Sequence, residues 1–280
     1  MGSSRASASE IREVQRGYTR VDGGRVGAGV GADGVSTSRP KWLWGWLGLY
    51  WLLTILMLIL VGVYISNSGG LQWKNVFSPV RMFNFHPLFQ TLGFLTIIGH
   101  SVLIYRVFPD ANIWVLQWTH ALLNLFGYIL MIIGVYSAGW SKDAQAQGER
   151  RTAHHFVSVH SWVGLVVLIL IAIQWLAGFF GLLWPGVHGA RRVAVRGVHI
   201  FSGNIIFLLG CATVLIGIDQ LKPTSTMNTM ALTVAAYALL GGYLLSTDVF
   251  YRGRMYRHPD ARGQMEDENA PLASTTVRYT

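Results

Sequence analysis

The sequence predicts an all-α membrane protein with six transmembrane helices, and three observations lead to this prediction. Hydrophobic residues make up 52% of the 280 residues and charged residues only 12%, a balance that is too apolar for a soluble domain of this size. Six apolar segments have, or come close to, the roughly 20 residues that a spanning helix needs. Tryptophans stand at the ends of several segments, as interfacial anchors do. The segments are 42–65, 88–107, 113–136, 156–183, 198–218 and 230–250.

Outside these segments, composition predicts two tails and no soluble domain. Residues 1–40 are rich in Gly, Ser, Arg and Val without sustained periodicity, so we expect them to form a disordered cytosolic tail. Residues 41–252 hold the six spans and form the membrane domain, and residues 253–280 form a second disordered cytosolic tail. The net charge of +9 does not indicate nucleic-acid binding, because no basic stripe is interleaved with stacking aromatic residues.

The basic residues predict the orientation of the chain. Six spans place both termini on one side of the membrane, and the side that is richer in Lys and Arg is cytosolic. The loops on the same side as the two termini, together with the residues that flank the first and last spans, hold most of the basic residues. These are Arg12, Arg16, Arg20, Arg25, Arg39, Lys41, Arg106, Arg191, Arg192, Arg196, Arg252, Arg254 and Arg257. The loops on the opposite side hold fewer, namely Lys74, Arg81, Lys142, Arg150, Arg151 and Lys222. Both termini are therefore predicted to be cytosolic, in a plasma membrane or in a secretory or endolysosomal vesicle.

Five histidines fall within or beside the predicted spans, and all but His100 sort into two pairs by depth. The second and fourth spans run inward, so His86 and His160, near their starts, lie toward the outer face. The third and fifth spans run outward, so His120 and His199 lie toward the cytosolic face. An imidazole in hydrocarbon is costly unless a partner satisfies it, so four of them at two matched depths indicate a functional site rather than isolated core residues.

Two facing pairs of neutral imidazoles suit axial ligation of haem iron inside a central four-helix bundle. Ligation from both sides leaves no open position on the iron, so the expected chemistry is electron transfer by two b haems. Zinc would need further ligands, and no Asp, Glu or Cys lies at either level. The single cysteine, Cys211, also excludes an iron–sulfur cluster and an intramolecular disulfide.

Glycines recur at helical spacing from the four histidines and share their helix faces. We interpret them as leaving room for flat porphyrin rings, since a ring can approach the backbone only where side chains are absent. The alternative is that they let membrane helices pack closely, and their recurrence on all four helices favours the first interpretation. These glycines are Gly93, Gly127, Gly134, Gly164 and Gly203.

Several short stretches of the chain resemble the cytochrome b561 family, and the resemblance covers about residues 66–221. The stretches are 83–87 (FNFHP), 103–108 (LIYRVF), 118–123 (WTHALL), 158–164 (SVHSWVG), 174–179 (QWLAGF) and 198–203 (VHIFSG). The intervals between the four histidines are also similar to those of the family, with a longer connection between the third and fourth spans. The resemblance implies a six-helix protein, usually a homodimer, whose middle four helices hold two b haems.

The resemblance further implies which residues bind the haems and the substrates. His86 with His160 would bind the outer haem and His120 with His199 the inner haem, the same pairing that depth predicts. Electrons would pass from cytosolic ascorbate to monodehydroascorbate or a ferric complex. Ascorbate is an anion, which suits the planar donor fork of arginine, although Arg106 alone would also be explained as a positive-inside anchor. Tyr105 and Arg106 match the family's inner motif, where ascorbate would bind, and Arg191, Arg192 and Arg196 match its basic inner loop. On the outer side, residues around the acceptor are matched by Asn84, Ser158, Ser161 and Trp162. Asn84 would also contact the outer haem.

Three positions depart from the family's pattern. His100 stands where relatives usually carry Asn, Asp or Glu, and it is expected near the inner haem as a hydrogen-bonding or proton-coupled residue, or else as a packing residue. Asn124 replaces a second histidine that many relatives carry four residues after the inner ligand, so the role of this position is open. An extra pair, His154 and His155, extends the outer loop; it would attract an anionic or iron-bearing acceptor, the alternative being a solvated loop.

Together these residues predict a transmembrane ascorbate-dependent oxidoreductase, either a ferrireductase or a monodehydroascorbate reductase. No side chain is given a catalytic role, because the haems carry the chemistry. The expected partners are ascorbate, the acceptor, the lipid bilayer and a second copy of the chain. Two alternatives stay open: a haem-free six-helix solute or metal carrier, whose histidines would form a transport path, and a membrane cytochrome that takes electrons from a quinol.

Overall fold

The structure, a computed structural model, describes residues 41–108, 111–183 and 189–246, and the regular secondary structure of these residues is helical. The predicted tails, 1–40 and 253–280, lie outside the described residues. Within the described ranges, five helices are long and apolar enough to cross a membrane, which confirms an all-α, multi-pass membrane protein. They are α2 (Lys41–Asn67), α7 (Ile113–Gly148), α8 (Val159–Gly178) with the π-helix η2 (Phe179–Leu183), α9 (Gly189–Asp219) and α10 (Ser225–Ser246).

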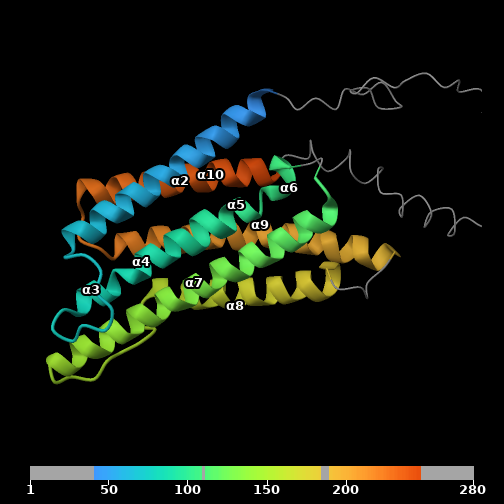
Figure 1. Ribbon diagram of the computed structural model, residues 1–280. Helices are drawn as coiled ribbons and strands as arrows, with labels where there is room; N and C mark the ends of the chain where they lie inside the picture. The colour runs from blue at the N-terminus through green and yellow to red at the C-terminus, as the bar shows by residue number, and fades with distance from the viewer. Residues whose placement is uncertain (1–40, 109–110, 184–188, 247–280) are drawn as a thin grey trace, which may run out of the picture. The chain divides into compact units, whose positions relative to one another are not determined.

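The prediction of one long helix over the second apolar segment, 88–107, is wrong. The chain instead passes through short helices of different pitch, and Figure 1 shows α4, α5 and α6 following one another alongside α7. The short helices are α3 (Pro79–Phe83), α4 (Phe85–Gln90), the π-helix η1 (Thr91–Ile98), α5 (Gly99–Ser101) and α6 (Ile104–Val107).

Two tyrosines from neighbouring helices stabilise this change of pitch. A π-helix shifts its hydrogen bonds to residues five positions apart, and side chains satisfy carbonyl groups around the shift. The Tyr237 hydroxyl of α10 donates to the carbonyl of Leu95, and the Tyr50 hydroxyl of α2 donates to the carbonyl of Gly99 at 3.1 Å. A Cβ atom on Gly99 would lie 1.9 Å from the Tyr237 hydroxyl, so this contact requires glycine.

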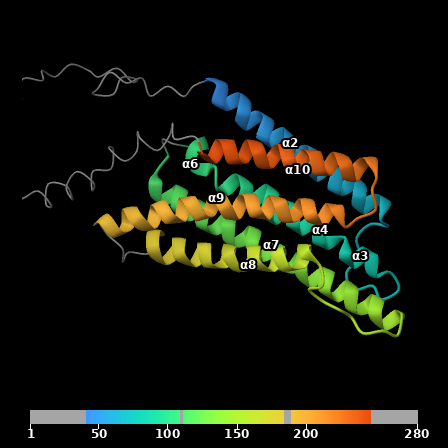
Figure 2. The ribbon, with the colours of Figure 1, turned by 180° about the vertical axis from the view of Figure 1, so that it is seen from behind.

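The helices pack mainly against their neighbours in the chain. α7 contacts α3, α4 and η1 and also contacts α8, while α8 packs on α9 and α9 packs on α10. Figures 1 and 2 both show α8, α9 and α10 in succession, with α2 crossing α10 on the side away from α8. The elements that carry the four predicted ligands, α4, α7, α8 and α9, are therefore neighbours in the fold.

The third span is much longer than predicted. Its 36 residues correspond to about 54 Å of helix, whereas the hydrocarbon core of a bilayer is about 30 Å thick. The predicted span ended at residue 136, and the helix continues through residues 137–148. Contacts with α3 support this extension, because the Ser141 hydroxyl donates to the carbonyl of Pro79 at 2.8 Å and Ala146 is buried.

Two other boundaries differ from the apolar pattern for local reasons. The fourth helix begins at Val159 rather than at residue 156, because Ser158 and Ser161 form a capping box that satisfies its first N–H groups. The fifth helix begins at Gly189, nine residues before the predicted boundary. The intervening residues include three arginines, which are good helix formers but are polar. A search for apolar runs therefore omits this part of the helix.

Candidate functional site

The outer histidine pair joins α4 and α8. The ring centroids of His86 and His160 lie 6.0 Å apart, with the ring planes at 85°. The Nδ1 atom of His86 lies 3.1 Å from the carbonyl oxygen of Gly134 on α7, and the Nδ1 atom of His160 lies 3.0 Å from that of Thr213 on α9. A carbonyl oxygen can only accept, so each Nδ1 carries the proton and each Nε2 keeps a lone pair that can bind a metal.

The inner pair joins α7 and α9. The ring centroids of His120 and His199 lie 6.4 Å apart, with the planes at 73°. The Nδ1 atom of His120 lies 3.0 Å from the carbonyl oxygen of Ser101, which fixes its tautomer in the same way. The Nδ1 atom of His199 is buried and has no hydrogen-bond partner among the described residues. The inner pair is therefore asymmetric, whereas the outer pair is not.

The spacing of both pairs fits haem iron. An imidazole nitrogen binds a metal at about 2.0–2.1 Å, so two rings on opposite sides of one iron have centroids about 6 Å apart. The observed separations are 6.0 and 6.4 Å. Within the described ranges, His, Cys, Asp and Glu form no group of three or more that could hold a metal. Each pair can therefore supply the two axial ligands of a haem but not a complete protein-only metal site.

Four of the five predicted glycines lie against other protein groups, and only Gly164 meets nothing closer than 3.6 Å. A Cβ atom on Gly93 would lie 2.5 Å from the carbonyl oxygen of Gly127, and one on Gly127 would lie 2.6 Å from that of Gly93. Gly134 and Gly203 are similarly close to the amides of Gln90 and Gln174. The porphyrin interpretation is therefore wrong for Gly93 and Gly127, and the helix-packing alternative is right: these residues let backbones approach closely.

Two other glycines lie directly against the histidine rings. A Cβ atom on Gly178 would lie 2.6 Å from Cε1 of His199, and one on Gly217 would lie 2.6 Å from Cε1 of His160. Each glycine stands eighteen residues after the histidine of its own helix, which is five turns and returns to the same face. Helical spacing could therefore have indicated both residues, but at eighteen residues from the histidine rather than at the shorter spacings of the predicted glycines.

Two amide side chains hold the backbone of the inner histidines. The Nδ2 group of Asn124 donates to the Ser101 hydroxyl and to the carbonyl oxygen of His120, the latter at 2.6 Å. The Nε2 group of Gln174 donates to the carbonyl oxygen of His199 at 2.5 Å, and its Oε1 accepts from the Ser202 hydroxyl at 2.8 Å. These contacts give Asn124 a defined place in the structure, which its departure from the family's pattern had left open.

At the end of the bundle that holds His120 and His199, arginine side chains meet the C-terminal ends of helices. Arg106 is 2% exposed and donates to the carbonyl oxygen of Leu245, in the last turn of α10. Arg192 donates to the carbonyl oxygen of Leu182 at 2.6 Å, near the end of η2. Cations are favourable at helix ends, where carbonyl groups lack helical partners. Among the other residues of the predicted ascorbate region, Arg191 is exposed, Arg196 is half-buried and the ring of Tyr105 lies 5.4 Å from that of His120.

Around the outer pair, the predicted residues differ in exposure. Asn84 is fully buried, and its Nδ2 group donates to the carbonyl oxygens of Ser68 and Gly70 in the loop after α2. Ser158 and Ser161 are half-buried and bond to each other in the capping box. Trp162 is exposed and lies beside Phe156. His155 is also exposed, and its Nε2 atom lies 2.9 Å from Oδ1 of Asp143, on the extension of α7.

His100 faces α2 rather than the inner pair. Its Nδ1 atom lies 2.6 Å from the carbonyl oxygen of Thr96, and its ring lies 4.2 Å from that of Trp51 and 5.1 Å from that of Tyr50. These contacts favour the packing alternative for this residue. The next residue, Ser101, supplies the carbonyl that holds His120, so His100 is linked to the inner pair through the backbone and not through its ring.

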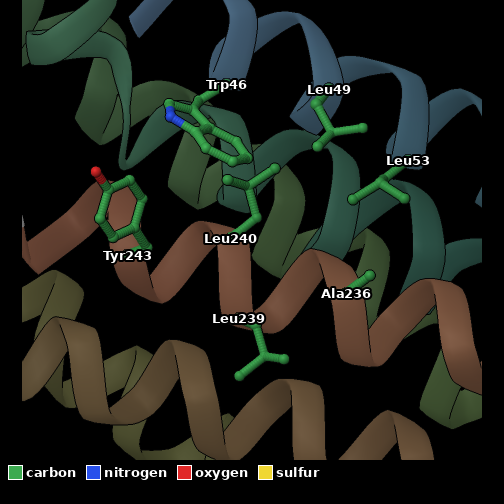
Figure 3. A pocket seen from close by; sticks show the side chains of 7 residues that line it. All are labelled: Trp46, Leu49, Leu53, Ala236, Leu239, Leu240 and Tyr243. Atoms are coloured by element: carbon green, nitrogen blue, oxygen red, sulfur yellow. The ribbon is translucent and has the colours of Figure 1, made fainter. Parts of the chain in front are cut away.

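A groove between α2 and α10 is separate from the histidine pairs. The groove has a volume of about 610 Å³. Figure 3 shows the side chains from both helices that line it. Its lining is apolar apart from one indole and one phenol, and it contains no histidine. Its lining residues are Trp46, Leu49, Leu53, Ala236, Leu239, Leu240 and Tyr243.

The fold and the histidine pairs define a class of protein: a multi-pass helical membrane protein whose neighbouring helices present facing histidines at two levels, suited to planar metal cofactors. Comparison with known proteins makes this specific. The family model described as eukaryotic cytochrome b561 matches residues 85–223. The chain belongs to the cytochrome b561 family, and membership implies haem b.

Named relatives span most of the chain. The transmembrane ascorbate-dependent reductase CYB561 of Ovis aries is 29% identical over 70% of this chain and 79% of the relative. The protein of the same name from Homo sapiens is 30% identical over 67% of this chain and 71% of the relative. The lysosomal membrane ascorbate-dependent ferrireductase CYB561A3 of Homo sapiens is 30% identical over 68% of this chain and 83% of the relative.

Proposed function

We propose that the chain transfers electrons across a membrane from cytosolic ascorbate, through two bis-histidine b haems, to an acceptor on the other side. The observation that carries this proposal is that two pairs of histidines face each other, with ring centroids 6.0 and 6.4 Å apart. The relatives' names, which include an ascorbate-dependent reductase and a ferrireductase, support the same activity. In this proposal residues 85–107 also cross the membrane, as the second of six spans, although they are not one continuous helix.

The chain's own residues would hold and orient the haems. His86 and His160 would bind the outer haem and His120 and His199 the inner one, each through Nε2. When bound, haem supplies iron that gains and loses one electron. The carbonyl groups of Gly134, Thr213 and Ser101 hold three of the four imidazoles as neutral donors of an Nδ1 proton.

The two levels are separated by a distance that α7 defines. Gly134, which contacts His86, stands fourteen residues after His120, and this corresponds to about 21 Å along the helix axis. The two histidine pairs therefore sit near opposite faces of a hydrocarbon core about 30 Å thick. Such an arrangement suits transfer across the membrane in two short steps rather than in one long one.

Ascorbate is proposed to bind at the inner end, near the ring of Tyr105, which lies beside His120. A cluster of arginines surrounds this end and suits an anionic donor. The same charges support a cytosolic location for this end and for both termini. The proposed ascorbate residues are Tyr105, Arg106, Arg191, Arg192 and Arg196.

The acceptor is proposed to be monodehydroascorbate or a ferric complex, reduced near the outer pair. Trp162 and His155 are exposed on this side and can contact an acceptor directly. The buried or half-buried residues would act by shaping the surface around the pair, and these are Asn84, Ser158 and Ser161. The active assembly is proposed to be a homodimer in the bilayer.

Spectroscopy of the purified protein tests the proposal. We expect a b-type spectrum, two haems per chain, and reduction by ascorbate in preference to a quinol. Vesicles preloaded with ascorbate should then reduce external ferric chelate or monodehydroascorbate, and comparison of the two rates identifies the acceptor. Absence of haem absorbance would sink the proposal in favour of a haem-free carrier, and preferential reduction by the quinol would favour a quinol-linked cytochrome.

A further inference from the structure

We infer that Asn124 and Gln174 are positioning residues that set the orientation and redox potential of the inner haem, each through an amide–serine clamp on the backbone of one axial histidine. The first clamp is Asn124 with Ser101, and the second is Gln174 with Ser202. This inference rests on the proposed function, because it supposes that the inner pair binds haem. It goes beyond that proposal by assigning the control of one haem to named side chains that are not ligands.

The first clamp is built on the helix that carries its ligand. Asn124 follows His120 by four residues on α7, so its side chain lies over the ligand's own turn. Its Nδ2 group donates to the carbonyl oxygen of His120 at 2.6 Å and to the Ser101 hydroxyl. The carbonyl oxygen of Ser101 accepts from Nδ1 of His120. A single serine on α5 is therefore tied to both the ring and the backbone of this ligand.

The second clamp has the opposite arrangement. Its amide lies on α8, across from the ligand helix, and its serine lies on α9, three residues after His199. The Nε2 group of Gln174 donates to the carbonyl oxygen of His199. Its Oε1 lies 2.8 Å from the Ser202 hydroxyl, whose single proton is shared between this oxygen and the carbonyl oxygen of Val198, 2.7 Å away. A Cβ atom on Gly203 would lie 3.0 Å from the Gln174 amide nitrogen, so a larger residue at this position would crowd the clamp.

Each clamp acts on a carbonyl group in the turn from which its histidine projects. An amide donor on that carbonyl fixes the peptide plane, and with it the direction of the ligand's Cα–Cβ bond. This matters most for His199, whose Nδ1 atom has no partner among the described residues. The ring of His199 is therefore oriented by its backbone and by contact with Gly178, not by a hydrogen bond of its own.

The outer pair lacks such clamps in the described part of the chain. The amide of Gln90, four residues after His86, donates to the carbonyl oxygen of Met131 at 3.0 Å. That carbonyl belongs to neither ligand. The difference predicts that removal of a clamping amide changes the inner haem and leaves the outer haem unchanged.

The test uses neutral replacements of similar size, Asn124→Leu and Gln174→Met, in the full-length protein. Partners that orient a metal ligand typically change metal affinity by about 10–100-fold when removed. We expect at least about 10-fold weaker retention of the inner haem, a shifted inner midpoint potential and altered inner low-spin electron paramagnetic resonance signals. Gln90→Met is the matched control and should leave the inner signals unchanged.

A milder pair of variants covers the case in which the larger replacements do not fold. Ser202→Ala removes the hydroxyl that anchors Gln174, and Ser202→Thr keeps it. We expect Ser202→Ala to shift the midpoint potential of the inner haem in the same direction as Gln174→Met does. Ser202→Thr, which keeps the hydroxyl, should retain the wild-type potential. An unchanged inner haem in all variants, or equal shifts of both haems, would overturn the inference. A wild-type protein without haem would instead overturn the proposed function.

Discussion

The outer and inner histidine pairs are held by different parts of the chain. In the outer pair, both Nδ1 atoms meet backbone carbonyls, those of Gly134 and Thr213. Gly134 stands fourteen residues after His120, and Thr213 stands fourteen residues after His199. The two halves of the bundle therefore repeat the same contact with the same spacing.

The inner pair breaks this repeat. His120 keeps a carbonyl partner at Ser101, but His199 has none among the described residues. Side-chain amides hold the inner backbone instead, one from the ligand helix and one from the helix opposite. A carbonyl group is present whatever the residue type, whereas an amide side chain can be replaced. The hydrogen bonds that hold the outer rings therefore do not depend on residue type, whereas those that hold the backbone of the inner ligands do.

Removal of one histidine ligand from either pair should have the largest effect, because it should remove the haem of that pair. His120→Ala should remove the inner haem and abolish reduction by ascorbate, because the donor reaches that haem first. His160→Ala should remove the outer haem, keep ascorbate reduction of the inner one, and stop transfer to an external acceptor. Haem quantitation and spectra recorded with ascorbate check both. Loss of both haems in both variants would contradict the separation into two independent sites.

Filling the glycine beside each pair should have the next largest effect. Gly178→Ala would press on His199, and Gly217→Ala would press on His160, since each new Cβ atom would lie 2.6 Å from the ring. Overpacking of this kind costs about 1–3 kcal/mol. We expect Gly178→Ala to alter the inner haem spectrum and Gly217→Ala the outer one. Gly139→Ala is the control, because its Cβ atom meets nothing within 4 Å; an equal effect there would contradict the steric argument.

Two arginines at the inner end should separate stability from ascorbate binding. Arg106 is 2% exposed and bonded to the end of α10, so Arg106→Ala should destabilise the protein by about 1.5–3 kcal/mol, the range for hydrogen bonds to charged groups. Arg191 is exposed, so Arg191→Ala should leave the melting temperature unchanged and raise the ascorbate concentration for half-maximal reduction. Thermal denaturation and ascorbate titration check both, and a stable Arg106→Ala protein would count against the first expectation.

The exposed pair on the outer loop should have the smallest effect. The side chains of His155 and Asp143 are 40% and 50% exposed, and exposed ion pairs contribute less than about 1 kcal/mol. A double-mutant cycle with His155→Ala and Asp143→Ala should therefore show weak coupling in thermal denaturation. If His155 contacts an iron-bearing acceptor, His155→Ala should slow ferric reduction while Asp143→Ala does not. Equal rates in both variants would remove His155 from the acceptor site.

Much of the helical framework could be predicted from apolar length and charge. Five predicted segments lie on the long helices, because a bilayer demands long apolar runs whatever their packing. The depth argument also brought together the residues that the structure places face to face, His86 with His160 and His120 with His199. The broken second segment was not foreseen, because its change of pitch depends on Tyr50 and Tyr237 from distant helices.

The surroundings of the histidines were harder to predict. Helical spacing shows which residues share a face, but not whether that face meets a cofactor or another backbone, and Gly93 and Gly127 meet each other. Family resemblance marked Arg106 as a substrate residue, and the sequence held no sign of its burial against α10. The amide contact of Gln174 crosses from α8 to α9 and depends on a side-chain rotamer that no local pattern encodes. Asn124 stands one turn after His120 on the same helix, but this spacing alone does not show that its amide binds the carbonyl of His120.

The length of α7 constrains how this membrane domain can tolerate insertions and deletions. Beyond Gly134, beside the outer pair, α7 continues to Gly148, and the chain must return over the same height before α8 begins one residue ahead of His160. The contact between His155 and Asp143 joins the last turns of α7 to the loop that leads back to α8, and we call these two segments the arms. Extra residues between the third and fourth spans are thus taken up as paired arms. A helix rises about 1.5 Å per residue and an extended chain about 3.3 Å. A deletion confined to one arm would therefore strain the register of His160, whereas deletions that shorten both arms by the same length would preserve it.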